Sequence, residues 1–210
     1  MINLHTRRIY VLSLLPLLAL LLGLSCASCR SEQESPDSSY PQDPPVAQNV
    51  RPQPASEDTL RQAAYEGRLQ AVLSELKKGA DVNAPDQDLR TALMMASFDG
   101  HTPVVQALLD VGARVDLRDG MGRTALMYAA SGTNPETVTL LLKYKADPNL
   151  VDSGEHWTAL MFAAAEGQTQ IVKILLEHGA DINLTDVDGE TAVDFARSNG
   201  HQDVLQVLQK

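Results

Sequence analysis

The chain has 210 residues and a formal net charge of −10, and it is 44% hydrophobic but only 4% aromatic. This length allows one or two ordinary domains, and the scarcity of rings predicts a core of Leu and small residues. Nucleic-acid binding needs clustered positive charge to neutralise phosphates, so the negative balance argues against that class of protein. Both cysteines lie at positions 26 and 29, so the rest of the chain has no thiolate nucleophile and no cysteine ligand for zinc.

The first 25 residues have the composition of an export signal. Arg7 and Arg8 precede an apolar run over residues 9–24, which is too short to cross a bilayer comfortably, and small residues follow it. A basic start, an apolar middle and a small-residue end predict a signal peptide over residues 1–25. The alternative is a short anchor helix that is not cleaved.

The segment "LGLSCAS" at 22–28 resembles the box of bacterial lipoproteins, in which a small residue precedes a lipid-bearing cysteine. This resemblance implies cleavage before Cys26 and a lipid anchor on its thiol, with Cys29 as the alternative acceptor. It predicts an exported protein of the periplasm or one anchored to the outer membrane. Ordinary cleavage near Ala27, giving a secreted or soluble periplasmic protein, stays open.

Residues 26–56 are predicted to form a disordered tether. Six of the eleven prolines lie in this stretch, among Ser, Gln and Asp residues. Such a composition has little apolar surface to bury, so it cannot offset the entropy lost on folding.

After the tether, one seven-residue phrase recurs with a nearly constant period. It reads "TALMMAS", "TALMYAA", "TALMFAA" and "TAVDFAR", starting at Thr91, Thr124, Thr158 and Thr191, with spacings of 33, 34 and 33 residues. A second phrase, "GADVN", "GARVD", "KADPN" and "GADIN", keeps a fixed phase with the first. Two phrases in phase indicate a repeat architecture. The predicted units are 57–89, 90–122, 123–156, 157–189 and 190–210.

The residues of one unit predict a helical hairpin. Thr124 can cap a first helix, Ala125 is a strong helix former, and Asn134-Pro135 can begin a second helix. Asp119-Gly120 is typical of a tight turn at the tip of the connecting loop. A single hairpin cannot bury its apolar face, so neighbouring units are expected to stack.

These phrases resemble the ankyrin repeat, and the resemblance covers about 57–210. It implies an all-α ankyrin-repeat solenoid of helix-turn-helix units with β-hairpin-like loops, five repeats including degenerate caps. Met94, Met127 and Met161 stand where the family usually has His, so the usual inter-repeat hydrogen-bond network is expected to be altered.

No catalytic constellation accompanies the repeats. The sequence contains no HExxH, GxSxG or GxxxxGK string, and His101 and His201 follow glycines at inter-helix turns, which favours a structural role. Acidic pairs such as Asp86/Asp88 and Asp186/Asp188 are expected to be solvated turn residues rather than calcium ligands. We therefore expect no enzyme activity, no cofactor and no metal.

The resemblance implies that loop tips and first-helix ends line a concave surface that binds a protein partner. The residues expected there are Tyr65, Arg90, Phe98, Asp99, Met121, Arg123, His156, Trp157, Glu166 and Glu190. Trp157, the sole Trp, lies in the one loop with an inserted residue. It is either an exposed binding anchor or a local packing group for that loop.

The sequence as a whole favours a non-catalytic protein-binding module of the bacterial cell envelope. The expected partners are a protein and, through the lipid, a membrane, with no nucleic acid and with a monomeric domain. The alternative is an inhibitor or immunity-type partner that stabilises or blocks an exported enzyme or toxin.

Overall fold

The computed structural model describes residues 56–209. The predicted signal peptide, nearly all of the tether, Cys26 and Cys29 lie outside the described residues. The described part contains ten helices and no strand: α1 Glu57–Tyr65, α2 Leu69–Lys77, α3 Ala92–Phe98, α4 Thr102–Asp110, α5 Ala125–Ser131, α6 Pro135–Lys143, α7 Ala159–Ala165, α8 Thr169–Glu177, α9 Ala192–Ser198 and α10 Gln202–Leu208. Within residues 56–209, none of these helices combines the length and apolar character that a membrane crossing requires.

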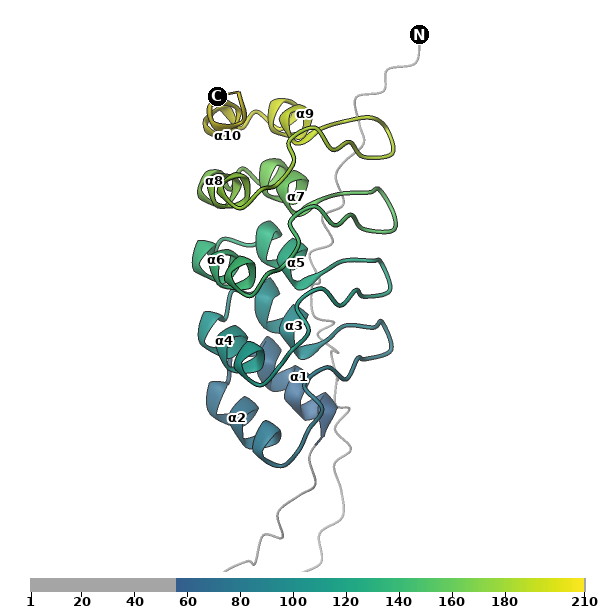
Figure 1. The fold of residues 1–210 in the computed structure, drawn as a ribbon, viewed down its shortest axis with the longest axis vertical. Helices are drawn as coiled ribbons and strands as arrows, with labels where there is room; N and C mark the ends of the chain where they lie inside the picture. Colours follow the sequence, from purple (N-terminus) through teal and green to yellow (C-terminus); the bar gives the residue numbers. More distant parts are fainter. Residues whose placement is uncertain (1–55, 210) are drawn as a thin grey trace, which may run out of the picture. The chain divides into compact units, whose positions relative to one another are not determined.

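The helices are arranged as five stacked pairs. Each odd-numbered helix packs on the even-numbered helix that follows it and on the next odd-numbered helix along the chain. Figure 1 shows the even helices in one column, the odd helices in a second, and the connecting loops projecting beside the odd column. This arrangement confirms the predicted all-α solenoid.

A threonine begins each of the odd helices α3, α5 and α7. The hydroxyls of Thr91, Thr124 and Thr158 accept from the backbone N–H three residues later, at 3.2–3.4 Å. In α3 and α7 the methionine at that third position also accepts a bond, because the Thr91 and Thr158 backbone N–H groups lie 3.4 Å from the thioether sulfurs. The thioether therefore serves as a weak acceptor in the capping box of these two helices.

The core repeats along the stack with small and large residues at fixed positions. Alanines on the odd helices are almost completely buried, which lets neighbouring helices approach closely. The largest buried side chains include Leu60, Leu93, Leu126 and Leu160 on the odd helices, Leu108, Leu141 and Leu175 on the even helices, and also Met94, Met127, Met161 and Ile171. Small residues and Leu thus fill most of the interior, as the composition predicts, and one Met in each of α3, α5 and α7 completes it.

One line of hydrogen bonds links the pairs near the starts of the even helices. His101 Nε2 lies 2.9 Å from the Tyr65 carbonyl, and His201 Nε2 lies 2.9 Å from the Ala165 carbonyl. Asn134 takes the same place between α3 and α5, because its amide donates to the Gly100 carbonyl at 2.9 Å. The histidines are therefore structural, as expected, and Asn is their substitute in the third pair.

A second line of bonds links the segments that follow the even helices. Asn83 accepts from the Arg114 backbone N–H at 2.8 Å, and Asn149 accepts from that of Asp181 at 2.8 Å. Asp116 holds the equivalent position and accepts from the Asp147 backbone N–H at 3.2 Å. Burial, together with the charge of Asp147, raises the pKa of Asp116. The bond that the carboxylate accepts is also longer than those that the two amides accept.

Helices α2, α4, α6 and α8 each end in a left-handed residue. Gly79, Gly112 and Gly179 adopt φ values of 94°, 91° and 88° just after α2, α4 and α8. Glycine adopts such a conformation without steric cost, which is why helices so often end on it. Lys145 holds the same position after α6 with a φ of 69°.

Candidate functional site

Each of the four projecting loops is organised by one aspartate. The loops are 86–90, 119–123, 152–157 and 186–190, and in each the first residue is an Asp whose Oδ1 accepts two backbone N–H groups at 2.8–3.2 Å. Asp119, Asp152 and Asp186 are buried, and Asp86 is half-buried. The expectation that Asp86 and Asp186 are merely solvated turn residues is therefore wrong, because their carboxylates satisfy the loop backbone.

The loop tips are joined to one another through the backbone. The N–H groups of Gly120, Ser153 and Val187 donate to the carbonyls of Asp88, Met121 and Glu155, at 2.8, 2.8 and 3.1 Å. Loop 152–157 contains one residue more than the others, yet its Glu155 carbonyl still accepts the bond from the next loop, as the carbonyls of Asp88 and Met121 do in the first two loops. The four tips consequently form one continuous edge beside the odd helices (Figure 1).

The residue before each capping threonine differs from loop to loop. Arg90 forms an ion pair with Asp86 at 2.8 Å and with Asp88 at 3.1 Å. Arg123 lies 3.7 Å from the Asp152 carboxylate and 5.2 Å from the centre of the Phe162 ring. Both guanidinium groups are therefore engaged by their own or the next loop, although each side chain keeps an exposed part.

Trp157 is the residue before the capping threonine in the third loop, 152–157. Its ring centre lies 5.0 Å from that of Phe162 and 4.4 Å from that of Phe195. The side chain is half-buried. The contacts are those of the local-packing alternative, and the same ring bridges α7 and α9. A binding role for Trp157 stays a prediction, and such a role would use only the ring's exposed edge.

Glu190 is the residue before the capping threonine in the last loop, 186–190. Burial is the largest cause that raises the pKa of Glu190, followed by the charges of Asp186, Asp194 and Asp188. A carboxylate therefore stands among other carboxylates at the position where the first two loops have an arginine.

The other predicted residues lie at the ends of the odd helices or, for Met121 and His156, on the loop tips. Tyr65, Asp99 and Met121 are exposed, whereas Phe98 and Glu166 are half-buried. Phe98 packs edge-on against Tyr128 with ring centres 6.0 Å apart, and this aromatic pair joins α3 to α5. His156 is exposed and has a left-handed backbone, with a φ of 60°.

Three loop tips expose a large apolar side chain. The exposed fractions are 51% for Leu89, 46% for Met121 and 52% for Val187. Sequence reasoning named Met121 but missed Leu89 and Val187. A signal was present, because both are aliphatic residues within a short polar loop that follows an Asp.

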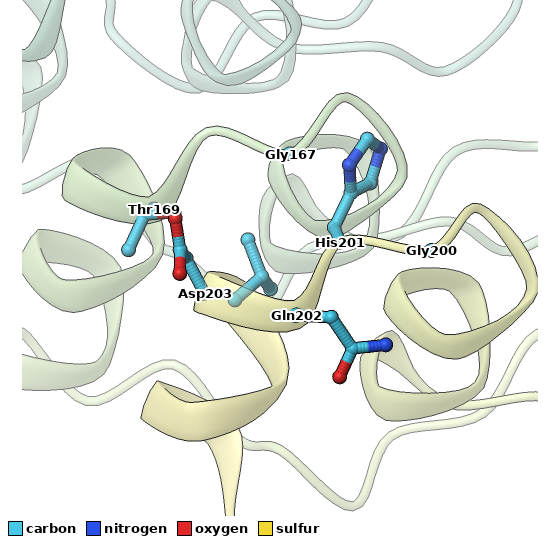
Figure 2. A pocket seen from close by; sticks show the side chains of 7 residues that line it. Gly167, Thr169, Gly200, His201, Gln202 and Asp203 are labelled. Carbon is cyan, nitrogen blue, oxygen red and sulfur yellow. The ribbon is translucent and has the colours of Figure 1, made fainter.

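A polar pocket of about 290 Å³ lies between the starts of α8 and α10. Figure 2 shows the His201 imidazole directed toward Gly167, with Thr169 and Asp203 among the other residues that line the pocket. Because His201 Nε2 is bonded to the Ala165 carbonyl, the ring forms part of the inter-pair link. Within residues 56–209, no three His, Cys, Asp or Glu side chains converge as metal ligands would.

The fold and its loops define a helical repeat protein with an extended, loop-edged surface. The family model for ankyrin repeats (three copies) matches residues 60–152 and 134–210. The chain belongs to the ankyrin-repeat family. Ankyrin repeats generally mediate protein–protein interaction and are typically non-catalytic. Comparison with curated proteins gave no match.

Proposed function

We propose that this protein is an exported bacterial protein that is held to the cell envelope by lipid on Cys26, or alternatively on Cys29, and that binds a protein partner. The binding surface is the edge of loop tips together with the ends of the odd helices, which we call the inner face. The observation that carries the proposal is the row of exposed apolar side chains on the tips of an ankyrin array. Exposed apolar residues gathered on one face are typical of an interaction surface.

The inner face is suited to binding because its framework does not depend on the exposed side chains. The buried aspartates and the tip-to-tip backbone bonds hold the loops, so Leu89, Met121 and Val187 are free to contact a partner. A preformed surface pays little ordering entropy on association.

The binding surface can be tested by capture from a native envelope extract with the full-length protein as bait. A variant that combines Leu89→Asn, Met121→Ser and Val187→Ser is expected to lose the captured partner. Asn tolerates the left-handed backbone of Leu89, and all three side chains are exposed, so thermal unfolding is expected to change little.

Leu73 offers a matched control, because it is apolar and 42% exposed but lies on the even helix α2. Leu73→Gln is expected to retain the partner. Retention of the same partner by the triple tip variant would contradict the assignment of the inner face, and capture of no protein by the parent would contradict the binding function itself.

The lipid anchor is tested separately by metabolic labelling with a fatty acid. The parent and Cys29→Ser are expected to incorporate the label, and Cys26→Ser is expected to lose it. If Cys26→Ser keeps the label and Cys29→Ser loses it, the anchor is at the alternative site, Cys29. If both single variants and the double variant are labelled as strongly as the parent, neither cysteine bears the lipid and the anchor is removed from the proposal.

A further inference from the structure

One position of the odd helices forms a row of half-buried apolar side chains along the stack. It is the fourth residue after each capping threonine, and Met95, Tyr128 and Phe162 hold it in α3, α5 and α7. We call these three residues the inner row. In α9 the same position is held by Phe195, which is buried and in contact with Trp157. The inner row therefore presents one apolar side chain per helix pair over three consecutive pairs.

The inner row lies where the odd helices meet the projecting loops. The Tyr128 hydroxyl donates to Asp119 Oδ2 at 2.6 Å, and the centre of the Phe162 ring lies 5.2 Å from the guanidinium carbon of Arg123. Asp119 and Arg123 both belong to loop 119–123. Because each of α3, α5 and α7 packs on the next odd helix, the row continues from one pair to the next. It is therefore part of the inner face, beside the edge of loop tips.

Two rings of the inner row are held in place by neighbouring rings. Phe98 and Tyr128 pack with an angle of 87° between their planes, and Trp157 and Phe162 pack with an angle of 63°. Edge-to-face contacts of this kind are favourable and orient both rings. A surface whose side chains are already held loses little conformational entropy when a partner binds.

The spacing of the inner row matches one turn of a polyproline II helix. Neighbouring packed helices lie about 8–10 Å apart, so the row offers one apolar side chain at about that interval. A polyproline II helix has three residues per turn and returns to the same side after about 9.3 Å. A strand returns to the same side after about 6.4–6.8 Å, and an α-helix after about 5.4 Å. Of these three conformations, only polyproline II places one residue of each turn on each helix pair.

Arg123 adds a charged group beside Phe162. Within residues 56–209 its Nε is buried without a hydrogen-bond partner, and the nearest carboxylate oxygen, on Asp152, lies 3.7 Å away, beyond hydrogen-bond distance. The side chain keeps an exposed part, and a guanidinium has five N–H donors. It is therefore available to an acceptor from a partner, and a carboxylate makes the strongest hydrogen bond of this kind.

We propose that the inner row binds an extended segment of a protein partner in the polyproline II conformation, with a proline at every third position and one acidic residue. The prolines pack on Met95, Tyr128 and Phe162, and the carboxylate meets Arg123. Aromatic-lined surfaces suit such segments because a proline-rich chain already adopts this conformation before it binds. The inference rests on the proposed protein-binding function and gives the chemistry of the partner.

Trp157 provides a reporter for the test, because it is the one Trp of the chain and its ring centre lies 5.0 Å from that of Phe162. The full-length protein is titrated at physiological ionic strength with the peptide GPAAPEAPAAPG, and binding is followed by Trp fluorescence and by isothermal titration calorimetry. The peptide GPPAAEAAAPPG has the same composition without the three-residue spacing. The peptide GPAAPQAPAAPG lacks the acidic residue, and GVTVEVTVG represents a strand-like partner.

We expect saturable binding of the first peptide and at least about tenfold weaker binding of the rearranged and strand-like peptides, because they cannot keep the register of the row. The peptide with Gln is expected to bind about two- to fivefold more weakly than the first, which is the range of a single exposed ion pair. No saturable binding of the first peptide would overturn the inference. Equal or tighter binding of the rearranged or strand-like peptide would overturn it as well.

Two variants of the inner face test the two kinds of contact. Met95→Gln gives α3 the residue that α1 has 33 positions earlier, Gln62, and is expected to weaken the first peptide about three- to tenfold because one apolar contact is lost. Arg123→Gln is expected to bind the Glu and Gln peptides equally, whereas a purely structural loss would weaken both and keep their ratio. Leu73→Gln on α2 is the control and is expected to bind like the parent. Parent-like binding by Met95→Gln, or an unchanged ratio in Arg123→Gln, would contradict the inference.

Capture from the envelope extract separates this inference from the proposed function. If the parent captures a protein that the triple tip variant loses, but does not bind the first peptide, the inner face binds a partner of another chemistry and only the inference fails. If the parent captures no envelope protein, the proposed function fails, and the peptide titration still decides the chemistry of the inner row.

Discussion

Lys145 holds a left-handed backbone at a position where three other helix pairs have glycine, and we expect this exchange to lower stability. Its φ is 69°, against 94°, 91° and 88° at Gly79, Gly112 and Gly179. A non-glycine residue in this region costs about 1–2 kcal/mol, whereas glycine adds about 0.4–1 kcal/mol of freedom to the unfolded chain. Lys145→Gly is therefore expected to raise the free energy of unfolding by about 0.5–1 kcal/mol.

Gly112→Ala is the reciprocal change. A Cβ atom built at Gly112 meets no other atom within 4 Å, so the substitution adds backbone strain without a steric clash. The free energy of unfolding is expected to fall by about 0.5–1 kcal/mol, because the strain of a left-handed alanine outweighs the freedom that the unfolded chain loses with the glycine.

Both variants can be compared by urea unfolding followed by far-UV circular dichroism, with thermal unfolding as a second measure. For a domain of this size, 1 kcal/mol corresponds to a shift of about 2–4 °C in Tm. Lys145 is exposed and its backbone N–H to Leu142 bond survives the change, so no lost contact obscures the result. A lower stability of Lys145→Gly, or an unchanged stability of Gly112→Ala, would refute the reasoning.

Three further substitutions test other parts of the stack. Ser97 is completely buried and its hydroxyl has no partner within the described residues, so Ser97→Ala is expected to add about 1 kcal/mol in urea unfolding, and a loss would contradict this. Asp116→Asn is expected to add about 0.5–1 kcal/mol at neutral pH. Burial and the charge of Asp147 raise the pKa of Asp116 in the folded protein above its ordinary value. The parent therefore loses stability as the pH rises from the ordinary pKa through the raised one, and the advantage of the variant should shrink when the pH falls below the ordinary pKa. A pH-independent difference would contradict the electrostatic part. Trp157→Ala removes the contact with Phe195 and is expected to cost about 2–3 kcal/mol, whereas unchanged unfolding would show that the ring contributes little.

The helical repeat could be predicted from the sequence because its signals are local. Thr124 as a cap, Asn134-Pro135 as a helix start and the period of 33–34 residues each involve neighbours within one unit. Local capping and turn preferences are strong enough to place elements, and stacking then follows from the repetition.

The details of the candidate surface could not be predicted because they depend on residues about one repeat apart. Whether Trp157 is exposed is decided by Phe195, which is 38 positions later and belongs to another helix. The acceptor role of the Met94 thioether was also hidden, since Met is usually treated as a packing residue. The sequence shows that Asp186 stands in a turn, but only the folded loop shows that its carboxylate binds two backbone amides.

The extra residue of loop 152–157 has a consequence for how such a surface can diversify. Since Glu155 still accepts the bond from Val187, the added length is absorbed outside the stack and the neighbouring loop keeps its register. The tips can therefore gain or lose residues while the helices beneath them stay fixed. A graft of a longer recognition peptide at this tip would have a rigid base already built for it.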